Sequence, residues 1–420
     1  MRFSISKPVS LLDEDVEIVA EDLLVAATVR FVLTLLHIDG KFESWAEFRA
    51  SSSGIVCFSR DAPLQGSYRG VDAMGLFSSI APADGRRCGS VLNCSAIAGL
   101  LLPFQLVARS RKGEILGQTT ILKRVLDPSI QRLEVSEGNI RGVLFRPKGN
   151  QVHGAVIDMY GLGGGCREHR AALLAEKGFV VLALGLFNYR DRPKRHNDVD
   201  ILYIKEAIDW ITSLTFASQT CALVGHSLGG LIAFLAALRY KKINAVVAIN
   251  APSFVDAGLS LLEDGRRAET YLFGPPQAKF AKTVDGEVHY VHMWNHILDS
   301  DAASIAPFFV PLEEAPEDIA FFLIAGEKDN VIPSARLQRR LEGRLRRNPR
   351  RRIEAAYLEH SGHMVEPPHL PHVSVAFTPP LCWSQGGDRY LQCVDQRTIW
   401  PKIQRFLKEA IAVNDDNSKL

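Results

Sequence analysis

The feature that most constrains the fold of this 420-residue chain is the pentapeptide Gly-His-Ser-Leu-Gly at positions 225–229. An apolar run at 221–224 precedes it, and Gly230 and a helix-forming stretch at 231–238 follow it. A serine in the pattern G-x-S-x-G between a strand and a helix is typical of a nucleophile elbow. Small flanking residues let the two elements approach, and the turn exposes the hydroxyl at a helix N-terminus. The pattern predicts that Ser227 is a nucleophile. The alternative is a solvated serine in an ordinary glycine-rich turn.

A nucleophilic serine of this kind needs an acid and a base, which follow it along the chain in the order Ser, acid, His. The apolar run 319–326 predicts a buried parallel strand, and Asp329 lies in the loop after it. The run 352–358 predicts a last strand, and His363 lies in the loop that follows. Both loops leave the carboxyl ends of strands, so we predict Asp329 as the acid and His363 as the base. The alternatives are Glu327 for the acid and His360, His369 and His372 for the base, and His226 is expected to be a packed residue of the elbow.

A glycine-rich loop is expected to supply one of the two backbone N–H donors of an oxyanion hole. The run 155–160 predicts a strand, and four of the five residues in 161–165 are glycine. Such a loop can turn its backbone amides toward a ligand. We predict that the N–H groups of Leu228 and Leu162 bind the oxyanion. A phosphate-binding loop is the alternative, but the segment matches neither G-x-x-x-x-G-K-[ST] nor G-x-G-x-x-G.

The chain from about residue 140 onward alternates apolar runs with helical patterns. Strands are expected at 179–184 and 244–249, and helices at 167–177, 199–214 and 398–411. This alternation predicts a mostly parallel sheet with helices on both faces. Together with the elbow and the order Ser, acid, His, it predicts an α/β-hydrolase domain. The alternation of strand and helix patterns is absent from about 251–315. This predicts an insertion that forms a lid or a wall of an acyl pocket above the active site.

The first 130 or so residues have a different pattern. Short strands without intervening helices are expected at 25–34, 45–50 and 115–122, which favours a β-sandwich. The predicted organisation is an N-terminal β-sandwich domain at 1–133 and a catalytic α/β-hydrolase domain at 134–420, with a targeting tail at 414–420.

Composition excludes several other classes of protein. The hydrophobic fraction of 47% is sufficient for two cores, and the net charge of +2 argues against nucleic-acid binding. No apolar run reaches the roughly 20 residues of a membrane span. Seven cysteines show neither zinc spacing nor a disulfide framework, which favours a reducing compartment. No metal or redox cofactor is expected. Arginines cluster at 339–352, either as a solvated helix face or as a site for substrate phosphates.

The printed sequence ends in Ser418, Lys419 and Leu420, after a polar stretch at 414–417. S-K-L at an exposed carboxyl terminus is the address for peroxisomal import. The expected location is the peroxisome matrix, and the expected partner is the peroxisomal import receptor.

Several segments together resemble the type I acyl-CoA thioesterases and the related bile acid-CoA:amino acid N-acyltransferases. The resemblance covers nearly the whole chain and is carried by GSYRGVDAMGL at 66–76, DMYGLGG at 158–164, EHRAALLA at 168–175, GF at 178–179, GEKD at 326–329 and GHMVEPP at 362–368. Lys328 departs from the pattern, which often has a second acid there, and the arginine-rich run of 344–352 is not part of it.

The resemblance implies hydrolysis of fatty acyl-CoA to free acid and CoA, with a triad at Ser227, Asp329 and His363. The amino-acid-conjugating members carry a cysteine nucleophile, so a serine at 227 favours the hydrolases. Three alternatives stay open: transfer of the acyl group to glycine or taurine, a general carboxylesterase or lipase, and a binding protein without catalysis.

Overall fold

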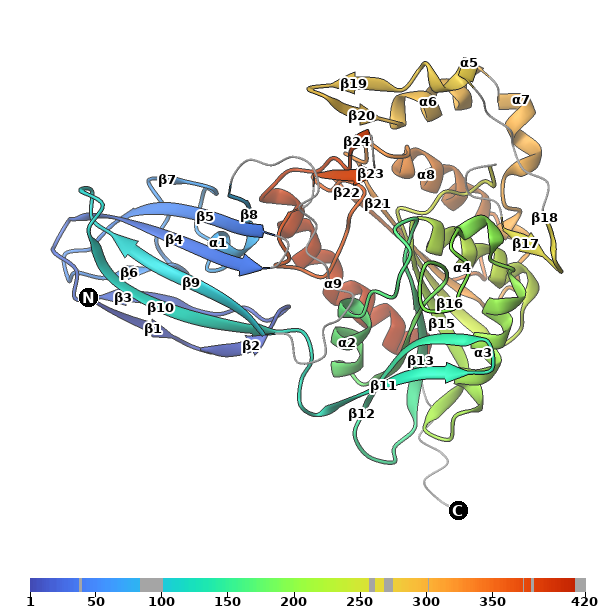
Figure 1. The fold of residues 1–420 in the computed structure, drawn as a ribbon, viewed down its shortest axis with the longest axis horizontal. Coiled ribbons are helices and arrows are strands. Elements are labelled where there is room, and N and C mark those ends of the chain that lie inside the picture. Colours follow the sequence, from blue (N-terminus) through green and yellow to red (C-terminus); the bar gives the residue numbers. More distant parts are fainter. Residues whose placement is uncertain are drawn as a thin grey trace.

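The computed structural model describes residues 1–37, 40–83, 101–256, 261–267, 275–300, 302–372, 374–378 and 381–411. Figure 1 shows a β-rich N-terminal part beside a larger part in which helices flank a central sheet. The tail at 414–420 lies outside the described residues.

The N-terminal part consists of two sheets that face each other. The smaller sheet has the order β1 (Arg2–Ile5), β3 (Ile18–Glu21), β6 (Val56–Cys57). The larger has the order β2 (Val9–Leu11), β10 (Ile115–Arg124), β9 (Leu101–Arg109), β4 (Thr28–His37), β5 (Gly40–Arg49), β7 (Gln65–Gly66), with β8 (Ala81–Pro82) paired to β5. Side chains of β4 alternate between buried and accessible, so one face of the larger sheet is apolar. On that face the ring of Phe31 lies 6.1 Å from the ring of Phe3 in β1, which confirms the predicted sandwich.

The larger part is built on an eight-stranded sheet. Its order is β11 (Ile130–Glu137), β12 (Ile140–Pro147), β14 (Phe179–Leu184), β13 (His153–Met159), β15 (Ala217–His226), β16 (Ile243–Ile249), β21 (Ala320–Gly326), β22 (Ile353–Leu358). Neighbouring strands from β14 to β22 are parallel, whereas β11 and β12 join antiparallel. The chain goes from β13 to β14 on one side and returns to β15 on the other. The carboxyl ends of β13 and β15 therefore flank a topological switch point, where open α/β sheets bind ligands.

Helices cover both faces of this sheet, as predicted. The helices that pack on the sheet are α2 (His169–Glu176), α3 (Leu202–Ser213), α4 (Leu228–Arg239), α8 (Ser334–Leu345) and α9 (Leu391–Ala410). Helices α2 and α9 pack in one buried cluster, and α3, α4 and α8 pack in another across the sheet. The final helix begins at Leu391, earlier than the predicted 398.

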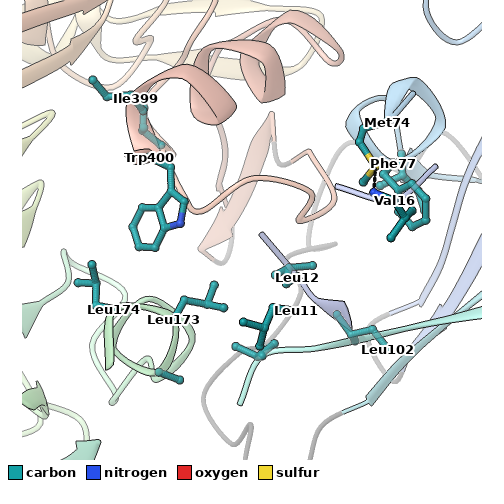
Figure 2. Close-up of a cluster of buried hydrophobic side chains, with 14 of the residues drawn as sticks. Leu11, Leu12, Val16, Met74, Phe77, Leu102, Leu173, Leu174, Ile399 and Trp400 are labelled. Carbon is teal, nitrogen blue, oxygen red and sulfur yellow. Dashed lines mark hydrogen bonds between the residues drawn. The ribbon is translucent and has the colours of Figure 1, made fainter. Parts of the chain in front are cut away.

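The two parts share a continuous apolar core. Leu11 and Leu12 of the sandwich lie in the same buried cluster as Leu173 of α2 and Trp400 of α9 (Figure 2). The indole N–H of Trp400 also donates a 2.8 Å hydrogen bond to Asp13. The chain leaves the sandwich after β10 and enters the eight-stranded sheet at β11, so the predicted boundary at 133/134 falls inside β11.

The segment between β16 and β21 departs from the α/β rhythm. Its described elements are α5 (Pro275–Ala278), α6 (Val291–Ser300), α7 (Ala302–Ile305), the 3-10 turns Ala306–Phe308 and Leu312–Glu314, and the hairpins β17 (Leu262–Glu263) with β18 (Arg266–Arg267) and β19 (Lys282–Val284) with β20 (Glu287–His289). The second hairpin pairs with a later one, β23 (Val375–Thr378) and β24 (Leu381–Ser384). The N–H of Val291 donates to the C=O of Asn330 at 3.0 Å, so the insertion contacts the loop that carries Asp329. Its role as a lid or pocket wall stays a prediction.

The described part of the chain contains no helix with the length and apolarity needed to cross a bilayer. Among its cysteines, Cys57, Cys166, Cys221 and Cys393 are free thiols. Cys382 is disulfide-bonded, although the sequence shows no disulfide framework.

Candidate active site

Ser227 forms a strained turn between β15 and α4. Its φ of +54° and ψ of −121° lie in a region that residues other than glycine rarely adopt. A Cβ atom on Gly225 would lie 2.3 Å from the C=O oxygen of Gly229, and one on Gly229 would lie 2.5 Å from the C=O oxygen of Met159. The two glycines are therefore required sterically, because any side chain there would separate strand, helix and the neighbouring β13.

A continuous chain of hydrogen bonds joins the three side chains predicted as a triad. His363 Nε2 lies 3.0 Å from Ser227 Oγ, and His363 Nδ1 lies 2.8 Å from Asp329 Oδ2. Their exposed fractions are 9% for Ser227, 4% for His363 and 4% for Asp329. The other carboxylate oxygen of Asp329 accepts the N–H groups of Val331 at 2.8 Å and Ile332 at 3.1 Å. The backbone thus fixes the acid, and the acid fixes the orientation of the imidazole.

The alternative acid and bases are engaged elsewhere. Glu327 forms an ion pair with Arg339. His360 Nδ1 lies 3.1 Å from the carboxylate of Asp388, and His369 Nδ1 lies 2.9 Å from the C=O of Leu12. For His372 the structure shows a backbone contact, in which its N–H donates to the C=O of Ile80 at 3.1 Å.

His226 contacts the backbone and the ring of His363, the predicted base. Its Nε2 donates a 2.7 Å hydrogen bond to the C=O of His363, and the two rings are 5.0 Å apart. Burial, with a smaller contribution from the proximity of His363, lowers the pKa of His226 to about 3. The ring is therefore neutral at physiological pH and acts as a packed hydrogen-bond donor, as expected from the sequence.

Asn250 is a supporting residue that the sequence did not reveal. It is fully buried, with φ of +46°. Its Nδ2 donates to the C=O groups of Gly362 at 3.0 Å and His363 at 2.7 Å, and its Oδ1 accepts from the Gly326 N–H at 2.8 Å and Ser334 Oγ at 3.0 Å. One side chain thereby joins the ends of β16 and β21 to the loop of the base. The only available signal is its position directly after a predicted strand on the catalytic edge of the sheet.

The glycine-rich loop after β13 lies directly against the nucleophile. A Cβ atom on Gly161 would lie 2.9 Å from Ser227 Cβ and 3.2 Å from Ser227 Oγ. Leu162 follows in that loop, and Leu228 begins α4. Within the described ranges, the backbone N–H groups of Leu162 and Leu228 donate to no protein acceptor. The glycine-rich loop and the start of α4 therefore both lie next to Ser227, and the oxyanion role of the two N–H groups stays a prediction.

Models of two linked protein families match the chain. "Acyl-CoA thioester hydrolase/BAAT N-terminal region" matches residues 13–137, and "BAAT / Acyl-CoA thioester hydrolase C terminal" matches residues 199–413, which include Ser227, Asp329 and His363. The chain belongs to the BAAT/acyl-CoA thioester hydrolase family. Family membership and the hydrolase fold identify it as an enzyme.

Curated members of the BAAT/acyl-CoA thioester hydrolase family align over most of the chain. The human bile acid-CoA:amino acid N-acyltransferase is 30% identical, covering 98% of this chain and 98% of that protein. The mouse bile acid-CoA:amino acid N-acyltransferase is 29% identical, covering 95% of each. The human mitochondrial acyl-coenzyme A thioesterase 2 is 29% identical, covering 94% of this chain and 81% of that protein.

This family member also has a pocket of about 350 Å³ beside the insertion. Its apolar lining includes Leu235 and Leu238 of α4 and Phe308 and Val310 of the insertion. Ser227 precedes Leu235 by eight residues, which places the pocket about 12 Å along the helix axis from the nucleophile. The pocket thus lies toward the far end of α4 from the triad.

The clustered arginines are mostly engaged within the protein. The ion pairs are Arg339 with Glu327, Arg344 with Glu313, Arg346 with Glu342, Arg350 with Glu317, and Arg352 with Glu354 and Glu409. Arg351 donates to the C=O groups of Leu312 and Ala315. These contacts favour a paired protein surface over a dedicated phosphate site. Over the residues that the structure describes, no cluster of His, Cys, Asp and Glu side chains is arranged to hold a metal ion.

Proposed function

We propose that this enzyme hydrolyses fatty acyl-CoA to free fatty acid and CoA through an acyl-serine intermediate on Ser227. The observation that carries the proposal is the hydrogen-bond chain from Ser227 Oγ through His363 to Asp329 at the tip of an elbow, in a member of the acyl-CoA thioester hydrolase family. A serine with a hydrogen-bonded base and an oriented acid is the arrangement that activates a hydroxyl for attack on an acyl carbon.

The mechanism follows from the roles that these atoms can take. His363 Nε2 removes the proton of Ser227 Oγ as the oxygen attacks the thioester carbonyl. The N–H groups of Leu228 and Leu162 stabilise the resulting oxyanion, and Asp329 holds the proton on His363 Nδ1 and stabilises the imidazolium. Collapse of the tetrahedral intermediate releases CoA thiolate, which takes up the proton from His363. His363 then activates a water molecule that hydrolyses the acyl-serine.

Transfer of the acyl group to an amino acid is the second candidate, because the human and mouse relatives above are named N-acyltransferases. The nucleophile favours hydrolysis. An acyl-serine is an oxygen ester, which amines capture less readily than a thioester, and the resemblance described above implies a cysteine nucleophile in the conjugating members. Product analysis with glycine or taurine present decides between the two.

Replacement of Ser227 by alanine tests the nucleophile. We expect CoA release, followed with a free-thiol reagent over a panel of acyl-CoA lengths, to fall by a factor of thousands, because triad members act as a unit. Ser213→Ala is the matched control, since that exposed hydroxyl donates to the C=O of Trp210 at 2.7 Å and lies at the end of α3. A Ser227→Ala variant that keeps more than about a tenth of the wild-type rate would exclude Ser227 as the nucleophile.

A comparison of leaving groups separates a thioesterase from a general carboxylesterase. We expect kcat/KM for an acyl-CoA to exceed that for the p-nitrophenyl ester of the same acid, because only the thioester carries the CoA moiety that the enzyme is proposed to bind. A preference for the p-nitrophenyl ester would favour the carboxylesterase.

We also propose import into the peroxisome matrix, on the S-K-L tripeptide at 418–420 alone. In that compartment the enzyme would release free acids and recycle CoA. A fluorescent fusion at the N-terminus, which leaves the tripeptide free for the import receptor, tests the location directly.

A further inference from the structure

The carboxylate of Glu366 joins two loops of the candidate active site. Its Oε2 accepts the hydroxyl of Tyr160 at 2.8 Å and lies 2.8 Å from Nε2 of His169. The hydroxyl of Tyr160 and Nε2 of His169 are themselves 3.0 Å apart. The guanidinium of Arg167 lies 3.7 Å from the other carboxylate oxygen. The Glu366 side chain is only 11% exposed, so these contacts form in a largely water-free environment.

The contact joins loops from two strands that are not neighbours in the sheet. Glu366 lies three residues after His363, in the loop that leaves the edge strand β22, whereas Tyr160 directly follows β13. Three strands, β15, β16 and β21, separate β13 from β22. The loop after β22 therefore runs along the carboxyl edge of the sheet. It places His363 beside Ser227 and, three residues later, Glu366 beside Tyr160. The residues next to Tyr160 are Gly161 and Leu162, the loop that lies against the nucleophile.

Tyr160 is fixed at its ring by Arg170 and at its hydroxyl by Glu366. The guanidinium of Arg170 lies 4.2 Å from the centre of the Tyr160 ring and donates a 2.8 Å hydrogen bond to the buried carboxylate of Asp158. Burial alone would raise the pKa of Glu366, but the neighbouring His169, Arg170 and Arg167 outweigh it and hold that pKa below its usual range. Glu366 is therefore ionised at neutral pH and is a strong acceptor for the tyrosine hydroxyl.

We propose that Glu366 is a positioning residue that fixes the Tyr160–Leu162 segment against the His363 loop. The backbone donor of Leu162 and the base at His363 belong to loops four strands apart in the sheet, and Glu366 is the side chain that joins them through a direct hydrogen bond to Tyr160. The inference rests on the acyl-serine mechanism proposed above. The added claim is that the Glu366–Tyr160 hydrogen bond sets the distance between His363 and the N–H of Leu162.

Glu366→Gln and Tyr160→Phe test the contact from its two ends. Glutamine keeps the shape of the side chain but removes the negative charge that contacts His169 and Arg167, and phenylalanine removes only the hydroxyl. We expect each variant to lower kcat by roughly 10- to 100-fold with KM changed less than about twofold, because a displacement of about 1 Å at a reacting group costs on this scale. The double variant should lose little more than either single variant, since both disrupt one contact.

Glu359→Gln is the matched control, because it makes the same change in the same loop at a side chain that is 84% exposed. Its kcat should equal the wild-type value. Thermal midpoints are measured for all variants, and if Glu366→Gln does not fold, Tyr160→Phe decides the question alone. A kcat equal to that of Glu359→Gln, whatever the thermal midpoint, overturns the proposal, as do losses that add in the double variant.

Ser227→Ala, assayed in the same series, separates this inference from the proposed function. If Ser227→Ala remains active, the acyl-serine mechanism fails and the positioning role fails with it. If Ser227→Ala is inactive while Glu366→Gln and Tyr160→Phe keep the wild-type kcat, the mechanism stands and only the positioning role is wrong.

Discussion

Replacing Asn250 by alanine removes four hydrogen bonds from a fully buried position that joins three loops of the active site. The C=O of His363 keeps His226 as a second donor at 2.7 Å, and the hydroxyl of Ser334 keeps a longer contact of 3.4 Å to the C=O of Gly326. The N–H of Gly326 and the C=O of Gly362 therefore lose most.

The expected destabilisation follows from these contacts. An orphaned buried polar group costs about 1–3 kcal/mol, so the N–H of Gly326 and the C=O of Gly362 together cost roughly 2–6 kcal/mol. Alanine must also adopt the φ of +46° that asparagine tolerates, which adds on the order of 1 kcal/mol. The sum of roughly 3–7 kcal/mol is a large part of the 5–15 kcal/mol typical of a folded protein. Because the C=O of His363 also loses one of its two donors, kcat should fall by about 10-fold or more.

Asn244→Ala provides the matched control on the same strand. Asn244 is half-buried near the start of β16 and donates to Thr220 Oγ1 at 3.1 Å and to the C=O of Ala410 at 2.9 Å. It should cost some stability and leave kcat unchanged. Urea unfolding and steady-state thiol release measure both properties. If Asn250→Ala matched Asn244→Ala in unfolding free energy and in kcat, the argument that Asn250 supports the base would be refuted.

Three further outcomes are expected. The pKa values of buried His226 and His369, each about 3, are lower than the roughly 6.5 of unfolded histidine. The unfolded state therefore binds more protons below pH 6.5, so stability should fall by up to about 2.7 kcal/mol per pH unit as pH decreases. A constant urea midpoint from pH 7.5 to 5.5 would contradict this. Ser227→Cys should shift products toward the amide when taurine is present, which mass spectrometry of both enzymes measures against wild type. Deletion of 418–420 should make an N-terminal fluorescent fusion cytosolic with unchanged activity in vitro, whereas a full-length fusion that is also cytosolic would remove the case for import.

The strands and the three triad positions could be predicted because they depend on local patterns. Continuous apolar runs ended by polar loops indicate buried parallel strands. The runs predicted at 319–326 and 352–358 match β21 and β22 within one residue at each end. Once those strands are placed, Asp329 and His363 must lie at the same sheet edge as Ser227, and the structure brings the three together.

The supports of the triad could not be predicted, because each depends on a partner far away in the sequence. Tyr160 and Glu366 are 206 residues apart, and Asn250 is 113 residues from His363. The early start of α9 at Leu391 is not predicted from the sequence for a related reason. Its first turns bury Gln392, whose amide donates to the C=O of Met364 at 2.8 Å, so a polar residue occupies the face where helical periodicity requires an apolar one.

The N-terminal sandwich also holds the loop of the base. His369, six residues after His363, is fully buried with φ of +70°, and its Nδ1 lies 2.9 Å from the C=O of Leu12 in the sandwich. The backbone N–H of His372 donates to the C=O of Ile80 at 3.1 Å. The loop that crosses the sheet edge is thus anchored first at Asn250, then at Tyr160, and finally at the sandwich. Because the two parts also share a core, the geometry at His363 depends on the N-terminal domain as well as on the hydrolase domain.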